Sequence, residues 1–419
     1  MLGTLNVSAV VTQQEKNKSA SIRSNDILAP CIPDEGAAGV RKGNGDVRKK
    51  RKKNRRVENA KKVIRDYGNG KRSANLELSR HTLYLSEYRQ LLEEIEEDDT
   101  LKIPLDNGLR YDYTVNNRGT SNKQSKQFVV RMPTAFHERL SEAIDDAIKD
   151  WRKDVRECKA QCVTGTCSGQ YCTHHRTIEI AENLMGHRSE SVHASELKES
   201  DKKDPDLSYA VEGYDTYDDE SGDDGVDNNQ SDSNILEWPA LVVEIGWSQT
   251  SSELQKKCEW YIKNSHGKVR TVIGVDLYDL YLCYPKPKTQ PRGLGKGENN
   301  RAVMEDIAKM VIATKEKKAL GKIFVWRAEI DSRTKQATAI LDGDGPQIFR
   351  DEDGKPAGEV AFRLTLEDFI SPTVLKRTGQ FHNPELAIMS APLCKRFELA
   401  LKIQIPRDRD NENKKGQEG

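Results

Sequence analysis

Residues 241–249 read LVVEIGWSQ, a run of aliphatic and β-branched residues that predicts a buried strand. One carboxylate, Glu244, interrupts this apolar run. A glutamate that leaves water costs several kcal/mol unless it is paired, protonated or bound to a cation. What this protein does therefore depends on what Glu244 faces in the folded chain.

The composition predicts one folded domain with polar arms. The chain has 419 residues, of which 32% are charged, and its mean hydropathy is −0.78. The formal net charge is zero, but a basic block covers residues 41–72 and an acidic block covers residues 212–232. No segment approaches the roughly 20 apolar residues of a membrane helix, and residues 1–30 lack the apolar core of a secretory signal. We therefore expect a soluble, intracellular protein without a membrane partner.

The periodicity along the chain predicts an α/β (α+β) fold, with a mixed central sheet flanked by helices. The expected helices cover residues 83–99, 134–155, 251–265, 304–319 and 384–405. The expected strands cover residues 109–115, 126–132, 206–211, 236–248, 268–279, 280–287, 322–330, 334–342 and 360–370. We expect a disordered basic arm at residues 1–78, a domain at 79–372 with a Cys/His insert (158–175) and an acidic loop (212–234), and a C-terminal helix and charged tail at 373–419.

A second carboxylate, Asp206, stands at the start of a predicted strand in the segment PDLSYAV. Strand alternation puts Val242, Glu244 and Gly246 on one side of their strand. It also puts Asp206 and Ser208 on one side of theirs. If the two strands are neighbours, both carboxylates converge on one hard cation, for which Mg²⁺ or Mn²⁺ is the expected metal.

The helix expected after Glu244 carries two adjacent lysines. Its apolar stripe contains Cys258, Tyr261 and Ile262. Lys257 lies on the flank of this stripe, and Lys256 points almost opposite. We therefore expect Lys257 to reach toward the sheet, into room left by the glycine at position 246, and Lys256 to lie in solvent.

These motifs, in this order, resemble those of the PD-(D/E)XK restriction-endonuclease-like superfamily. The order is Pro205 and Asp206, then the strand with Glu244, then the helix with Lys257 and Tyr261. A branch of nuclease-like proteins from bacteria and fungi is the nearest in pattern. Four segments carry that likeness, namely RMPTAFHERLSEAI, PALVVEIGWSQ, GKVRTVIGVDLYDLYLCY and VAFRLTLEDFI, and it covers roughly residues 128–370.

The resemblance implies a four-stranded mixed sheet flanked by helices, with Asp206 and Glu244 as metal ligands. It also implies hydrolysis of nucleic-acid phosphodiester bonds by a metal-activated water. The family motif has its lysine two residues after the glutamate, where this chain has Gly246. A lysine moved onto the helix, as in related families, would be Lys257. Gln249 is a further catalytic candidate, as an amide that orients water or a base.

Each of these residues also has an alternative interpretation. Glu244 can be one half of a buried salt bridge, with Arg270 or Lys257 as its partner. Asp206, after a proline, can be a turn or cap residue, and Lys257 can be a solvated helix lysine. The corresponding alternative functions are an inactive nuclease-fold protein that binds nucleic acid or another partner, and a protein-binding scaffold. Glu138 on the helix at residues 134–155 is a candidate auxiliary acid.

Two further motifs suggest ligands. Residues 41–62 form a basic cluster that is typical of nuclear import or of phosphate contact, and its alternative is a solvated tail with neither role. With the nuclease resemblance, we expect DNA, or alternatively RNA, as a partner. The nucleus is then the expected compartment, with the cytoplasm as the alternative. A candidate zinc site, whose alternative is an insert with incidental thiols, contains Cys158, Cys162, Cys167, Cys172 and His174.

Overall fold

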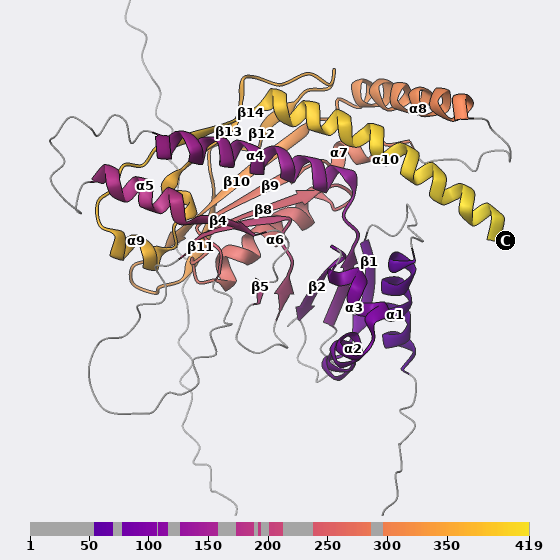
Figure 1. Ribbon diagram of the computed structural model, residues 1–419, viewed down its shortest axis with the longest axis horizontal. Coiled ribbons are helices and arrows are strands. Elements are labelled where there is room, and N and C mark those ends of the chain that lie inside the picture. Colours follow the sequence, from indigo (N-terminus) through magenta and orange to yellow (C-terminus); the bar gives the residue numbers. More distant parts are fainter. Residues whose placement is uncertain are drawn as a thin grey trace, which may run out of the picture. The chain divides into compact units, whose positions relative to one another are not determined.

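A computed structural model describes most of the chain (Figure 1). The described residues are 54–69, 78–106, 108–115, 126–157, 173–187, 192–193, 201–212, 238–285 and 296–418. Three predictions lie outside these ranges. They concern the basic block before residue 54, the four cysteines at 158–172 and the acidic tract after residue 212. Among the described helices, none combines the length and the apolar content that crossing a membrane requires.

In the described part of the chain the largest sheet has seven strands, not the four that the resemblance implies. Their order is β11-β10-β9-β8-β7-β4, with β12 beside β10. Its parallel pair is β8 with β9, whereas the other pairs are antiparallel, so the sheet is mixed as predicted. A parallel pair needs a crossover connection, and α6 (Ser251–Asn264) provides it. The strands are β4 (Leu184–His187), β7 (Leu207–Val211), β8 (Leu241–Gly246), β9 (Thr271–Asp276), β10 (Gly321–Ile330), β11 (Ala337–Leu341) and β12 (Gln347–Arg350).

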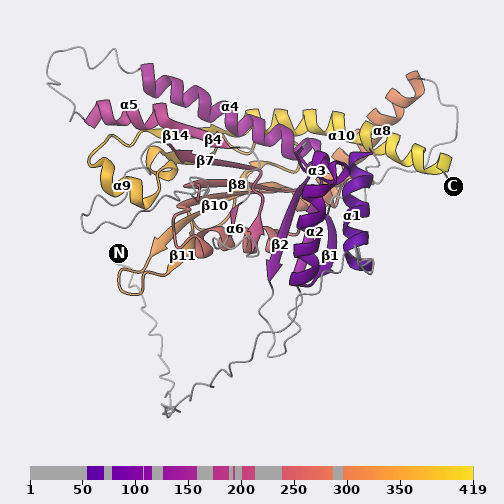
Figure 2. The ribbon, with the colours of Figure 1, turned by 60° about the horizontal axis from the view of Figure 1, so that its bottom comes forward.

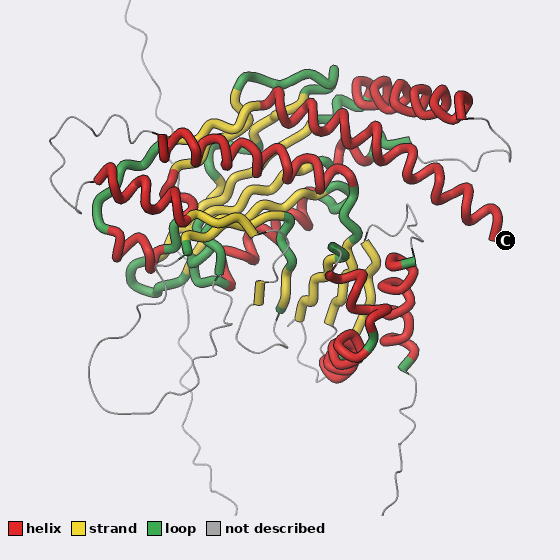
Figure 3. Tube along the Cα trace, in the orientation of Figure 1, coloured by secondary structure: helices red, strands yellow, loops and turns green. Residues whose placement is uncertain are grey.

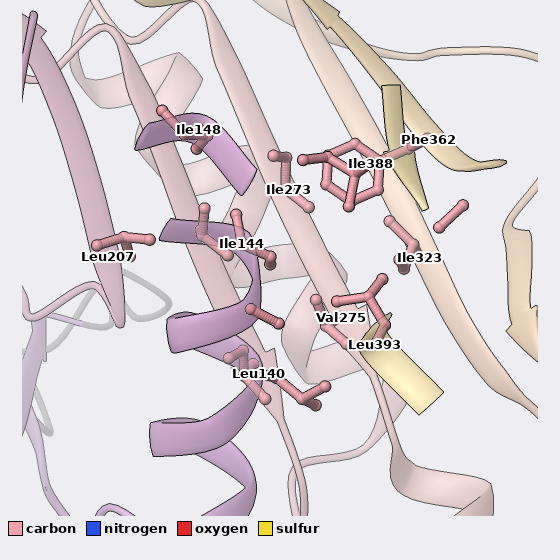
Figure 4. Close-up of a cluster of buried hydrophobic side chains, with 14 of the residues drawn as sticks. Leu140, Ile144, Ile148, Leu207, Ile273, Val275, Ile323, Phe362, Ile388 and Leu393 are labelled. Carbon is pink, nitrogen blue, oxygen red and sulfur yellow. The ribbon is translucent and has the colours of Figure 1, made fainter. Parts of the chain in front are cut away.

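Helices cover both faces of this sheet, which confirms an α/β protein (Figures 2 and 3). On one face lie α4 (Ala135–Glu157) and α10 (Ser390–Glu418), and α6 lies on the other. Figure 4 shows Leu140, Ile144 and Ile148 of α4 near strand residues of the sheet. Alternation along β8 decides which side chains meet which helix, because Val243 belongs to the α4 core and Val242 to the α6 core.

A second sheet has the order β1-β3-β2-β6-β5 and its own hydrophobic core. Its strands are β1 (Leu78–Leu83), β2 (Arg110–Val115), β3 (Lys126–Arg131), β5 (Val192–His193) and β6 (Lys202–Lys203), and its helices are α1 (Arg55–Gly68), α2 (Leu85–Glu97) and α3 (Asp99–Asp106). Within the predicted disordered arm at residues 1–78, helix α1 corrects the prediction for residues 55–68. Its buried side chains recur at helical spacing within a dense run of charge, at Val57, Ala60, Ile64 and Tyr67.

Two further predictions are wrong. Residues 280–287, predicted as an edge strand, begin within the single helical turn α7 (Tyr278–Tyr281). The helix predicted from residue 384 starts only at Ser390, because Leu386 and Ile388 alternate as the buried residues of a strand, β14 (Glu385–Met389). Helix α10 then runs through the predicted charged tail.

The remaining described elements include a short strand, β13 (Val360–Thr365), which pairs with β14. The others are α5 (Thr173–Asn183), α8 (Lys296–Glu316), the 3₁₀ turn η2 (Leu366–Phe369) and α9 (Pro372–Thr378).

Candidate functional site

Asp206 and Glu244 lie beside each other at an antiparallel pair of strands, so the condition stated above, that the two strands are neighbours, is met. The register pairs Leu207 with Val243, so one further step puts Asp206 opposite Glu244. The Asp206 N–H donates to the Val243 carbonyl at 3.1 Å, and the Asp206 carboxylate accepts from the Ile245 N–H at 2.6 Å. Both acids are buried, with exposed fractions of 1% for Asp206 and 0% for Glu244. The two carboxylates are thus held at the same level of the sheet.

Helix α6 brings two further polar groups to Glu244. The Lys257 Nζ is 2.9 Å from Glu244 Oε1, and the Tyr261 hydroxyl donates to the same oxygen at 2.6 Å. Lys257 is buried and Lys256 is exposed, as the helical spacing predicts. The salt-bridge interpretation of Glu244 is therefore correct as far as Lys257 is concerned. The other suggested partner, Arg270, lies 2.7 Å from Glu367 instead.

The local sequence explains how α6 begins and how close it lies to β8. Thr250 caps the helix, because its hydroxyl accepts from the Glu253 N–H at 3.3 Å. A Cβ added to Gly246 would lie 3.1 Å from a methyl carbon of Leu254. The space beside Gly246 is thus filled by Leu254, and this corrects the expectation that Lys257 would use it. The glycine allows α6 to pack closely on the end of β8.

Two arginines from the second sheet reach the acid pair. Arg110 of β2 forms an ion pair with Asp206. Arg131, at the end of β3, has its Nη1 3.4 Å from Glu244 Oε2 and its Nε 3.3 Å from Asp112 Oδ2. Neither arginine was predicted for this site. Arg131 nevertheless carries the same signal as Glu244, since it is a charge next to an apolar strand run, FVV.

These contacts belong to one buried network of acids and bases, which we call the charge cluster. Lys257 links its two sides, since its Nζ is 3.3 Å from Asp112 as well as close to Glu244. Lys202 lies 3.4 Å from Asp204 at the edge of the same network. The members are Arg110, Asp112, Arg131, Lys202, Lys203, Asp204, Asp206, Glu244 and Lys257. Opposite charges thus accompany each other inside the protein, as burial requires.

The pKa values of the two opposed acids shift in opposite directions. Burial raises the pKa of Glu244, and Lys257 and Arg131 only partly offset this effect. Burial also acts on Asp206, but Arg110 and its cationic neighbours prevail and hold the pKa of Asp206 below its ordinary value. Asp112 behaves like Asp206, because Arg131 and Lys257 outweigh its burial and lower its pKa. Glu244 is therefore the acid of this pair that protonates more readily.

These shifts predict how stability depends on pH. Asp112 and Asp206 contribute stability that is present above their ordinary pKa of 3.8 and is lost as the pH falls. Glu244 has the opposite sign, since its contribution is present below its ordinary pKa of 4.5 and is lost as the pH rises through the raised value. Urea unfolding from about pH 3 to 7 should show a loss of stability on the acid side that Asp112→Asn reduces. An unchanged acid slope in this variant would contradict the assignment.

Other predicted and unpredicted residues lie near this network. His137, which was not predicted, is buried at the start of α4, and its Nδ1 accepts from the Thr134 N–H at 3.2 Å. Gln249 lines a hollow together with His137 and Arg131. Glu138, the suggested auxiliary acid, is exposed and has Arg407 of α10 as its partner at 3.7 Å. The structure thus brings Gln249 to the edge of the site and gives Glu138 a different partner.

The zinc prediction is represented in the described residues only by its histidine. His174 lies on α5, and its ring centroid is 6.0 Å from that of His382. The cysteines at 158, 162, 167 and 172 lie outside the described ranges. Within those ranges, no group of three or more His, Cys, Asp or Glu side chains is placed so that it could hold a metal ion.

Comparison of the chain with known proteins finds no matching family model, no matching curated protein and no matching solved structure. The functional argument therefore starts from the geometry of Asp206, Glu244 and Lys257.

Proposed function

We propose that the protein is a metal-dependent nuclease that hydrolyses phosphodiester bonds of DNA. One observation carries the proposal: Asp206 and Glu244 lie opposite each other on neighbouring strands, and the Lys257 Nζ is 2.9 Å from Glu244. Three separate segments of the chain supply these residues. A mixed sheet between α4 and α6 is also the arrangement that the likeness to the PD-(D/E)XK superfamily implies, and it supports the proposal.

The donor set suits a hard divalent cation. Mg²⁺ and Mn²⁺ prefer carboxylate oxygens, and Asp206 and Glu244 would hold the ion. In this structure those carboxylates contact Arg110, Arg131 and Lys257. Metal binding therefore requires that the two arginines withdraw, and the ion would replace positive charge that is already present. When bound, it would polarise a phosphate oxygen and activate a water.

The chain's own groups orient Glu244 and supply charge. Tyr261 and Lys257 both contact the same oxygen, Oε1, and so fix the orientation of the carboxylate. The ammonium group of Lys257, held beside Glu244, would offer positive charge to a phosphate bound at the same ion. In a site shielded from water such a charge stabilises the transition state more strongly than in solution.

A second function is favoured by a different observation. Arg110 and Arg131 neutralise the acid pair in the structure, which is what an inactive nuclease-fold module for binding nucleic acid would show. Two basic residues of α1 are already paired with acids of the same sheet's helices or turns. Lys61 lies 2.6 Å from Glu94 of α2, and Arg65 lies 2.8 Å from Asp98. We keep DNA as the proposed partner and the nucleus as the proposed compartment, on the basic sequence at 41–62.

The proposal predicts nicking of supercoiled plasmid with Mg²⁺ or Mn²⁺ but not with chelator. Glu244→Ala and Asp206→Asn should each reduce the nicking rate by about 100-fold or more, because each removes a carboxylate from the metal site. The inactive module would instead bind DNA without nicking it. Its binding would weaken with salt and would not depend on metal. If the protein neither cleaves DNA nor binds it in a salt-dependent way, only the protein-binding scaffold remains.

A further inference from the structure

A small hollow opens beside the charge cluster, where β3 ends, α4 begins and β8 gives way to the turn before α6. Its empty volume is about 240 Å³, part of which is open solvent. The polar side chains that line it are Arg131, His137, Ser248 and Gln249. Trp247, stacked on Phe136 with ring centroids 3.8 Å apart, forms part of its wall. Nothing in the proposed catalytic chemistry requires this hollow.

Among the described residues, every polar side chain in the lining can donate a hydrogen bond, and none of them is a carboxylate. Arg131 supplies a permanent positive charge. Its Nε faces Asp112, its Nη1 contacts Glu244 and its Nη2 donates to the Asp204 carbonyl, so the second N–H of each Nη is what it can offer a ligand. This absence of acids is notable because the buried acids Asp112 and Glu244 are direct neighbours of the Arg131 guanidinium. The described lining therefore carries hydrogen-bond donors, and the acids Asp112 and Glu244 contact Arg131 without being part of the lining.

His137 is a donor toward the hollow for two reasons. Its Nδ1 accepts a hydrogen bond from the Thr134 N–H, which leaves the proton of the neutral ring on Nε2. Burial lowers the pKa of His137 to about 4, with Asp206 acting against this shift and Arg110 and Arg131 adding to it. At neutral pH the ring is therefore uncharged and offers one N–H.

We propose that this hollow binds one phosphate group of a nucleic-acid backbone, with Arg131 as the charged donor and His137, Ser248 and Gln249 as neutral donors. The inference rests on the proposed function, since it identifies the substrate group held beside the acid pair. Arginine is suited to this task because its hydrogen bonds to phosphate are charge-assisted. Arg131 also contacts Glu244, so a phosphate in the hollow competes with Glu244 for the guanidinium group.

The test uses the full-length protein with chelator, so that no cleavage takes place. The probe is a thymidine dinucleotide with one phosphodiester, compared with its uncharged methylphosphonate analogue and with inorganic phosphate. Binding is followed through the His137 ring resonance, which His137→Gln identifies. Gln249→Leu removes one donor from the half-buried lining, and Gln255→Leu makes the same change on α6, outside the hollow.

We expect the dinucleotide to shift the His137 resonance and the methylphosphonate analogue to have little effect. Gln249→Leu should weaken dinucleotide binding about tenfold, the effect of losing one hydrogen bond to a charged group, and Gln255→Leu should not. Three results would overturn the assignment. They are equal binding of the dinucleotide and its methylphosphonate analogue, no shift of the His137 resonance, and binding of inorganic phosphate but not of the dinucleotide. Because the readout is binding without metal, it is independent of whether the protein cleaves DNA.

Discussion

Replacing Arg131 with methionine is expected to lower the free energy of unfolding by about 3–5 kcal/mol, because the buried acids Glu244 and Asp112 then share one cation, Lys257. Arg131 lies within 3.4 Å of Glu244 and 3.3 Å of Asp112. Burial opposes its charge, but Asp112, Glu244 and Asp206 outweigh burial and raise the pKa of Arg131. The charged arginine is thus strongly favoured in the folded state. Urea unfolding at neutral pH measures the loss.

A matched control is Arg139→Met on α4. Arg139 lies 2.7 Å from Glu142, but both side chains are about one-third exposed, and such pairs contribute about 1 kcal/mol or less. Adding Glu244→Gln to Arg131→Met should restore part of the lost stability, because it removes one of the two buried acids that then share Lys257. Equal losses for Arg131→Met and Arg139→Met would show that the charge cluster is not a significant source of stability.

The sequence predicted the centre of the site because the decisive signals there are local. A carboxylate inside an apolar strand is visible in LVVEIGWSQ, and helical spacing separates the buried Lys257 from the exposed Lys256. Strand alternation grouped Glu244 with Val242 and Asp206 with Ser208, and the observed register, which pairs Ser208 with Val242, puts both acids on the same face of the sheet. Each of these inferences used residues within one strand or one helix, where the periodicity is fixed by backbone geometry.

The rest of the site depends on contacts between segments distant in sequence. Arg110 meets Asp206 across 96 positions, and Arg131 meets Glu244 across 113. No local pattern in β2 or β3 predicts which carboxylate Arg110 or Arg131 will face, because the pairing depends on how the second sheet packs against the first. Helix α1 was missed for another reason, because its apolar stripe is hidden in a run of lysines and arginines.

Replacing Lys257 with methionine is expected to reduce metal-dependent DNA cleavage by about 100-fold or more, the typical effect of removing one group that stabilises transition-state charge. Its Nζ lies between Glu244 and Asp112, at 2.9 and 3.3 Å, and the side chain is buried. Lys256→Met is the matched control, because it removes the same group from the adjacent but exposed position. Thermal unfolding of both variants shows whether each remains folded at the assay temperature.

The most direct test of the proposed nuclease site is therefore the rate of plasmid nicking by the wild-type protein, Lys257→Met and Lys256→Met, each with manganese and with chelator. The account predicts manganese-dependent nicking that Lys256→Met retains and that folded Lys257→Met loses. Nicking that survives in Lys257→Met, or that chelator does not abolish, would contradict a metal-dependent site built from Asp206, Glu244 and Lys257.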